Sequence, residues 1–251
     1  MRMLLNFPIL FALIAFVVMW AATQFGARTS LVRDFSGKER EEFNIVLGAT
    51  LTMLGLIIGF TFSMAVGRYD QRKNYEEEEA NAIGTEYVRA DLLPSADADK
   101  VHALLKQYLA ERITFYETRD RSALPQINNE TTKLQNEMWA AVAAAARTQQ
   151  TPILALVASG MNDVLNRQGY TQAAWWNRIP VAAWGLMAFI AIVCNVLVGV
   201  AAHEAKTHRS LLILPVMVAI AFMLVADLDS PRGGIIRVAP QNLISLQSSM
   251  Q

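Results

Sequence analysis

The sequence predicts an all-α fold, with four transmembrane helices and a helical extramembrane domain between the second and the third. Of its 251 residues, 53% are hydrophobic, and the mean hydropathy is +0.27. Four apolar stretches contain no Lys, Arg, Asp or Glu. Each approaches the roughly 20 residues that a helix needs to cross a bilayer core of about 30 Å. Elsewhere no segment keeps the apolar–polar alternation of a strand, which favours helix throughout.

The expected spans cover residues 7–23, 45–66, 179–202 and 211–226. They divide the chain into a first transmembrane pair (1–66), a helical domain (67–178), a second transmembrane pair (179–229) and a C-terminal tail (230–251). Trp20 near the end of the first span, and Trp175, Trp176 and Trp184 at the start of the third, suit an interfacial aromatic belt. Because Arg2 precedes the first apolar stretch, that stretch also has features of a signal peptide. We expect it to be retained as a span.

The distribution of basic residues gives the expected orientation. With four spans, both termini and the helical domain share one side of the membrane. Near the membrane that side carries seven basic residues and the other six. Lys and Arg are enriched on the cytoplasmic side of bacterial and other membranes, so we place both termini and the 67–178 domain in the cytoplasm. The expected location is the bacterial inner membrane, with the bilayer itself as a partner.

The segment 67–178 has the periodicity of consecutive helices. The second span is expected to continue outward past Arg68 and to stop before Pro94, with the next helix starting near Ser95. Further helices are expected over residues 130–147 and after Pro152, the last leading toward the third span. The run of four adjacent glutamates at 76–79 points all round a helix, so most of these carboxylates are expected to be solvated.

The second span carries the first group of candidate functional residues. Gly55 and Gly59 have the small-xxx-small spacing that lets helices approach closely in lipid. Phe60 and Phe62 point in different directions on a helix, so only one of them can face a central axis. A ring of phenylalanines around such an axis would form a hydrophobic constriction, whereas membrane phenylalanines more often face lipid. The pore and gate candidates are Leu56, Gly59, Phe60, Phe62 and Ser63.

The fourth span ends in the second group of candidates. At 16 residues it is short for a span, and it meets the polar sequence 227–234, which contains Pro231 and two glycines. One interpretation is an ion site, since carboxylates at membrane depth are costly and usually functional, and backbone N–H groups beside an arginine can hold an anion. The other is a polar helix cap at the interface. The candidates are Asp227, Asp229, Arg232 and Gly233.

Several function classes find no support in the sequence. Lys plus Arg and Asp plus Glu both number 22, which gives no basic character for nucleic acid. The single cysteine, Cys194, and the widely spaced histidines provide no metal-ligand pattern. We find no phosphate-binding loop or nucleophile elbow, so we predict no enzyme, no cofactor and no metal.

Five segments together resemble the bacterial bestrophin-like membrane proteins. They cover nearly the whole chain: residues 60–70, residues 79–87, residues 90–94, Asn162-Asp163 with Arg167, and residues 229–237. Bestrophins have four spans in two pairs with a helical cytoplasmic region between them. They form pentameric, chiefly anion-selective channels whose second span lines the pore and bears a hydrophobic neck. This chain is shorter than a bestrophin and has no clear acidic calcium-binding cluster near its C-terminus.

The resemblance implies a homo-oligomeric channel for small inorganic ions, chiefly chloride, with the second span lining the pore. A pentamer is the implied assembly. Phe60 or Phe62 is then the neck candidate, with Leu56 one turn before Phe60. The alternative hypothesis is a non-conducting membrane scaffold or signalling protein, whose cytoplasmic helices bind a partner protein.

Overall fold

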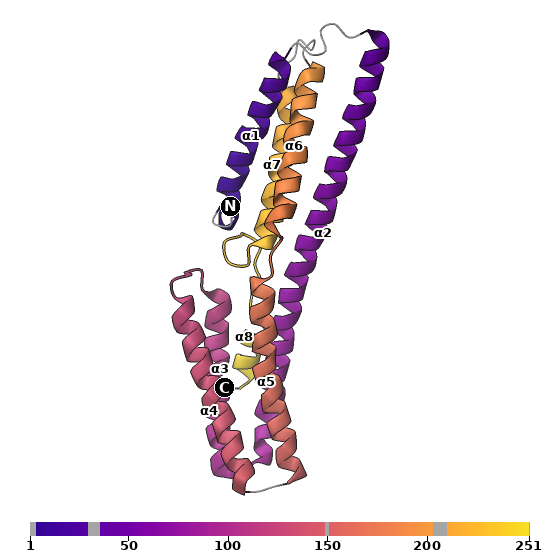
Figure 1. Cartoon of the computed structure of the whole chain (residues 1–251). Coiled ribbons are helices and arrows are strands. Elements are labelled where there is room, and N and C mark those ends of the chain that lie inside the picture. Colours follow the sequence, from indigo (N-terminus) through magenta and orange to yellow (C-terminus); the bar gives the residue numbers. More distant parts are fainter. Residues whose placement is uncertain (1–3, 30–35, 149–150, 203–209, 251) are drawn as a thin grey trace. The chain divides into compact units, whose positions relative to one another are not determined.

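The computed structural model describes residues 4–29, 36–148, 151–202 and 210–250. In these residues all regular structure is helical, which confirms the all-α prediction. The chain forms two compact units: Met1–Arg68 with Arg178–Arg237, and Tyr69–Asn177 with Val238–Gln251. One continuous helix, α2 (Gly37–Arg89), contributes to both units (Figure 1). The sequence-based expectation that the second span continues outward past Arg68 is therefore confirmed.

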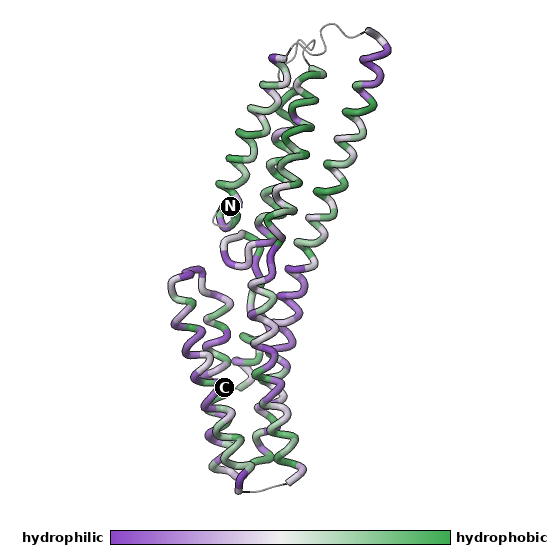
Figure 2. The backbone as a smooth tube through the Cα atoms, viewed as in Figure 1, coloured by the Kyte–Doolittle hydropathy of each residue, from purple (hydrophilic) through white to green (hydrophobic). Residues whose placement is uncertain are grey.

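The first unit holds the most apolar helices of the chain, coloured green in Figure 2. They are α1 (Pro8–Arg28), the first part of α2, α6 (Val181–Ala201) and α7 (Ile213–Asp229). Among the described residues, three helical stretches are long and apolar enough to cross a membrane: α1, the stretch that contains α2, and Pro152–Ala201, which contains α6. Helix α7 has 17 residues, about 26 Å at 1.5 Å per residue. The fourth span therefore stays a prediction.

Helices α1 and α6 touch through glycine. A Cβ atom on Gly26 of α1 would overlap the backbone carbonyl of Val196, and one on Gly199 of α6 would overlap the carbonyl of Thr23. Beside this contact, the buried Thr23 hydroxyl lies 3.1 Å from Asn195 Oδ1. Small residues and an interhelical hydrogen bond are the means by which helices associate in lipid, so this pair of helices forms a tight contact.

An aromatic cluster joins α7 to the same two helices. The Trp184 ring lies 5.3 Å from the Phe11 ring and 6.1 Å from the Phe222 ring, edge-on in both cases, a favoured geometry for aromatic pairs. The sequence placed Trp175 and Trp184 in an interfacial belt. Both are instead buried, Trp184 in the first unit and Trp175 in the second.

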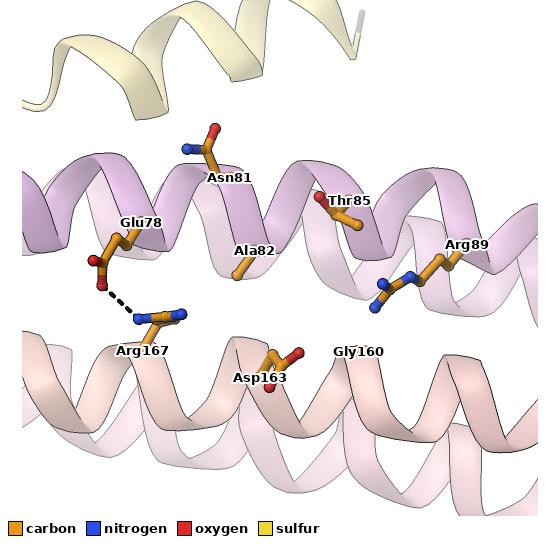
Figure 3. A pocket seen from close by; sticks show the side chains of 8 residues that line it. All are labelled: Glu78, Asn81, Ala82, Thr85, Arg89, Gly160, Asp163 and Arg167. Carbon is orange, nitrogen blue, oxygen red and sulfur yellow. Dashed lines mark hydrogen bonds and ion pairs between the residues drawn. The ribbon is translucent and has the colours of Figure 1, made fainter.

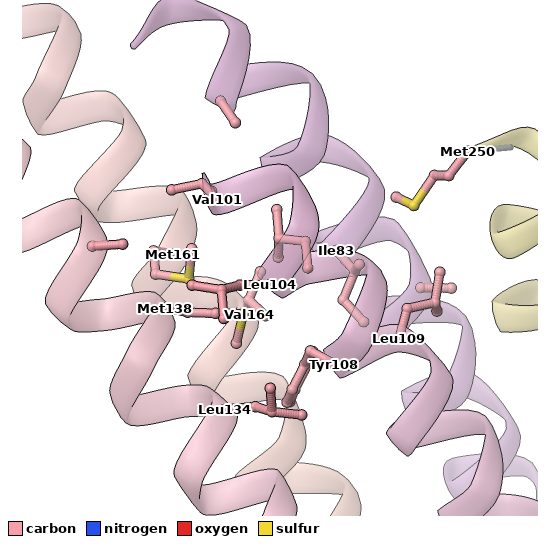
Figure 4. Close-up of a cluster of buried hydrophobic side chains, with 14 of the residues drawn as sticks. Ile83, Val101, Leu104, Tyr108, Leu109, Leu134, Met138, Met161, Val164 and Met250 are labelled. Carbon is pink, nitrogen blue, oxygen red and sulfur yellow. The ribbon is translucent and has the colours of Figure 1, made fainter. Parts of the chain in front are cut away.

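The second unit is a bundle of helices around one apolar core (Figure 4). It comprises the rest of α2, a short 3-10 helix (Ala90–Leu92), α3 (Ser95–Glu117), α4 (Leu124–Thr148), α5 (Pro152–Trp176) and α8 (Gln241–Ser249). Pro94 and Thr151 precede α3 and α5, close to the predicted starts. The core side chains recur at helical spacing, among them Val101, Leu105, Tyr108, Met138, Val157 and Met161.

Two glutamates of the run 76–79 are buried, so the expectation that most of this run is solvated is wrong for them. Glu79 is fully buried and accepts hydrogen bonds from Arg112, Tyr116 and Thr171. Burial of the Tyr116 phenol and the neighbouring Glu79 charge raise the pKa of Tyr116 well above its usual value. The Glu79 carboxylate of α2 is thus bonded by side chains of α3 and α5, which ties these three helices together.

Glu76 fixes the C-terminal helix. Its carboxylate, only 1% exposed, accepts hydrogen bonds from the backbone N–H of Asn242 and Leu243 and from the Asn242 side chain, at 2.7 to 3.0 Å. A carboxylate at a helix N-terminus satisfies free N–H groups and complements the helix dipole. Residues 238–251, part of the expected C-terminal tail, therefore belong to the second unit.

Replacing Glu76 with alanine is expected to release α8. The substitution leaves the N–H groups of α8 without their acceptor, at a cost of about 2 kcal/mol. Hydrogen exchange of residues 241–249 is expected to rise at least tenfold. The exposed neighbour Glu77 provides the control: Glu77→Ala is expected to leave exchange unchanged. If α8 is as well protected from hydrogen exchange in Glu76→Ala as in the wild type, the capping role of Glu76 is contradicted.

Candidate functional site

The five pore and gate candidates are all exposed on α2. In the single chain, Phe60 is 64% exposed, Leu56 56% and Phe62 40%. Gly59 and Ser63 are exposed as well. The opposite side of the helix is the packed one, with Leu54, Thr61 and Ala65 buried. Leu56, Gly59, Phe60 and Ser63 thus share the side that α2 does not use for packing within its own chain, whereas Phe62 points in another direction.

A stripe of small residues runs along this free side. Gly48, Thr52, Gly55, Gly59 and Ser63 are all exposed, and at about 100° per residue they share one side of the helix. We call them the small-residue stripe. A Cβ atom on Gly48, Gly55 or Gly59 would meet nothing within 4 Å. Gly26 of α1 and Gly199 of α6, by contrast, are already used in a helix contact.

The two phenylalanines diverge, as the sequence predicts. Being two residues apart, Phe60 and Phe62 point about 160° away from each other. Phe60 shares its direction with Leu56, one turn earlier. If a central axis exists on this side of α2, Leu56 and Phe60 face it together and Phe62 does not.

Asp227 is held by the chain that follows it. Its carboxylate accepts hydrogen bonds from the backbone N–H groups of Ile235 and Ile236, at 2.7 and 2.8 Å. A Cβ atom on Gly234 would lie 2.6 Å from the Asp227 carbonyl oxygen, so the fold-back needs glycine there. The N–H of Gly233 is also engaged, because it donates to the Ser230 hydroxyl. These bonds tie residues 233–236 to the end of α7.

Asp229 is the centre of a second cluster. The carboxylate, 2% exposed, accepts a hydrogen bond from the Ile179 N–H at 2.9 Å and lies 3.8 Å from Arg68 and 3.9 Å from Arg178. Arg178 also donates to the Asp229 carbonyl oxygen and to the Asn6 side chain. The cluster joins the middle of α2, the segment before α6, the end of α7 and the N-terminal segment.

The sequence analysis placed Arg232 among the candidates at this site and missed Arg68 and Arg178. Arg232 is itself 8% exposed. Arg68 lies within α2 and Arg178 before α6, so their closeness to Asp229 depends on the packing of helices far apart in the sequence. The one signal in the sequence was that Asp229, Arg68 and Arg178 all lie near the ends of the expected spans.

Two cavities of the second unit border α2. One, of about 340 Å³, lies between α2 and α5 and is lined by Glu78, Asn81, Ala82, Thr85, Arg89, Gly160, Asp163 and Arg167 (Figure 3). The other, of about 710 Å³, is a groove between α2 and α8. Within the described ranges, no group of three or more His, Cys, Asp or Glu side chains could hold a metal ion.

The sequence matches the bestrophin-like domain over residues 9–243, most of the chain. The chain belongs to the bestrophin-like family. The recognition made from the sequence segments is therefore confirmed. Among curated protein sequences, none matches this bestrophin-like chain.

Solved structures of a bacterial bestrophin homologue from Klebsiella pneumoniae have the same fold. A leucine-to-threonine variant superposes with a TM-score of 0.66 at 11% identity, covering 95% of this chain and 97% of that one. The structure phased on zinc gives 0.62 at 13% identity, covering 96% and 98%. A tyrosine-to-alanine variant gives 0.62 at 12% identity, covering 94% and 98%. At such identity the likeness establishes the fold of this bestrophin-like protein.

Proposed function

We propose that the protein is a homo-oligomeric, anion-conducting channel of the cytoplasmic membrane, with α2 lining the pore. One observation carries this proposal: the small-residue stripe of α2 is exposed and its glycines are unused within the chain. In lipid, small residues allow helices to approach closely. Because this stripe is not packed within the chain, α2 has a surface on which the same helix of other protomers can pack around a central axis.

The side chains beside the stripe supply a constriction. Leu56 and Phe60 are exposed in the single chain and lie on the same side of α2. Repeated around an axis, they would form two adjacent apolar rings, the kind of constriction that gates by dewetting. Four spans, a pentamer and a cytoplasmic second unit are parts of the same proposal, supported by membership in the bestrophin-like family.

Reconstitution into planar bilayers tests the proposal. Under a chloride gradient we expect unitary currents whose reversal potential follows the chloride equilibrium potential. Phe60→Ala is expected to increase the open current several-fold, because it widens the ring and removes the apolar barrier to water. A bilayer that stays silent across pH and calcium concentration would overturn the proposal.

Phe189 on α6 provides a matched control, since its side chain is 65% exposed and that of Phe60 is 64% exposed. It faces away from the packed side of a different helix, so Phe189→Ala is expected to leave the current unchanged. Equal effects of the two substitutions would show that α2 does not line the pore. A silent oligomer that captures a stable partner by crosslinking would support the scaffold alternative.

A further inference from the structure

Glu86 of α2 is a buried carboxyl group without a hydrogen-bond partner. Its side chain has no exposed surface, and in the described part of the chain neither carboxyl oxygen receives a hydrogen bond. The other buried glutamates of this helix, Glu76 and Glu79, each accept several. Because an ionised carboxylate in such surroundings has lost its hydration without replacement, the protonated form is strongly favoured.

The residue opposite Glu86 is a glycine. A Cβ atom on Gly160 of α5 would overlap Glu86 Oε2 and Arg89 Nη1. Because position 160 carries no side chain, the ends of the Glu86 and Arg89 side chains reach the backbone of α5 there. The carboxyl group of Glu86 therefore forms part of the contact surface between the two helices, and a change in its charge or hydration acts on that contact directly.

The charged groups around Glu86 act in opposite directions. Burial raises the pKa of Glu86 to about 8, the nearby Arg89 lowers it, and Asp163 of α5 raises it. The other charged pair of this region, Glu78 with Arg167, is joined by an ion pair. The effect of burial therefore outweighs that of Arg89, and the change of charge falls in the mildly alkaline range.

A cavity gives solvent a route to this contact. Gly160, Arg89 and Asp163 all line the space of about 340 Å³ between α2 and α5. Figure 3 shows Asp163 of α5 and Arg89 of α2 extending into the space between the two helices near Gly160. Water and protons can reach the Gly160 side of the Glu86 contact without unfolding of the bundle.

We propose that Glu86 is a reversible proton-binding site: with the proton bound it packs against Gly160, and without it water enters from the cavity and α5 separates from α2. The site lies wholly within the second unit, so the proposal goes beyond ion conduction and does not require it. Since α2 is continuous from the small-residue stripe to Glu86, proton loss acts on the helix proposed to line the pore.

Infrared spectroscopy of the full chain in nanodiscs tests proton binding. The wild type is expected to show a protonated carboxyl band that disappears between pH 7 and 9 and is missing from Glu86→Gln. The exposed Glu77 is the matched control, and Glu77→Gln is expected to retain the band. Glu86→Met, which keeps the volume without titrating, serves as the second variant. Loss of the band below pH 6, or its persistence in Glu86→Gln, would overturn the assignment.

Thermal unfolding measures the linked stability. Because the folded chain holds this proton to a higher pH than the unfolded one, the contribution of Glu86 is fully present below the ordinary pKa of 4.5 and is lost as pH rises through about 8. We expect the Tm to fall by on the order of 5 °C between pH 6 and 9, and Glu86→Gln to remove this part of the fall. An identical pH profile in the variant would contradict the proposal.

Spin-label distances test the separation of the helices. Labels at the exposed positions Val88 and Leu156, introduced as Val88→Cys and Leu156→Cys in a Cys194→Ala background, report on α2 and α5. The distance is expected to lengthen from pH 6 to 9 in the wild type and to stay short in Glu86→Gln. A distance that does not depend on pH in the wild type, or that still lengthens in Glu86→Gln, would overturn the proposed movement. Conduction plays no part in any of these readouts.

Discussion

Replacing Gly199 with alanine is expected to destabilise the first unit by about 3 kcal/mol, the upper range for overpacking a close contact. The new Cβ would meet the backbone carbonyl of Thr23, and a backbone atom cannot turn aside as a side chain can. Helices α1 and α6 would have to separate, which also strains the Thr23–Asn195 hydrogen bond. Denaturant unfolding of the detergent-solubilised protein measures the loss.

Gly185 lies on the same helix and gives the control. A Cβ there would meet nothing within 4 Å. Gly185→Ala is therefore expected to be neutral or to stabilise by about 0.5 kcal/mol, through the better helix propensity of alanine. Comparable unfolding curves for the two variants would show that the close approach of α1 and α6 does not contribute to stability.

Replacing Asp229 with alanine is expected to cost about 3 kcal/mol, since removing one member of a buried charge cluster leaves the others uncompensated. Arg68 and Arg178 are largely buried, with side chains 15% and 19% exposed, and both lose their carboxylate. The Ile179 N–H loses its acceptor as well. We expect a lower Tm and a smaller monodisperse fraction after solubilisation.

Two further variants separate the contributions at this cluster. Asp229→Asn keeps an acceptor for the Ile179 N–H while removing the charge, so it is expected to lie between the wild type and Asp229→Ala. Asp70 on α2 is exposed, and Asp70→Ala is expected to behave as the wild type. An Asp229→Ala protein as stable as the wild type would mean that the carboxylate serves ion binding rather than the fold.

Local signals in the sequence placed most of the helices. Pro94 and Pro152 fix helix starts because proline lacks an N–H and is tolerated in the first turn. The periodic apolar residues of α3 and α5 became the core of the second unit. The Phe60–Phe62 divergence likewise follows from helix geometry alone. Each of these inferences depends on neighbours within a few residues along the chain.

Long-range partners could not be predicted in the same way. Positions 76–79 all carry the same residue type, glutamate, yet Glu77 is exposed while Glu79 is fully buried. Glu79 differs from Glu77 because the side chains of Arg112, Tyr116 and Thr171 form hydrogen bonds to it. These contacts join residues far apart in the sequence, so neither composition nor residue spacing predicts them.

By itself, the sequence determined the helical class, the apolar stretches and the family, because hydrophobic periodicity and local motifs depend only on the residues present. The tertiary structure decided which glycines are used. Gly26 and Gly199 meet neighbouring backbones, while Gly55 and Gly59 meet nothing within 4 Å. It also decided that Asp229 pairs with Arg68 and Arg178, and that Glu86 is buried without a hydrogen-bond partner. The physical reason is the same in each case: burial and pairing belong to surfaces brought together by folding.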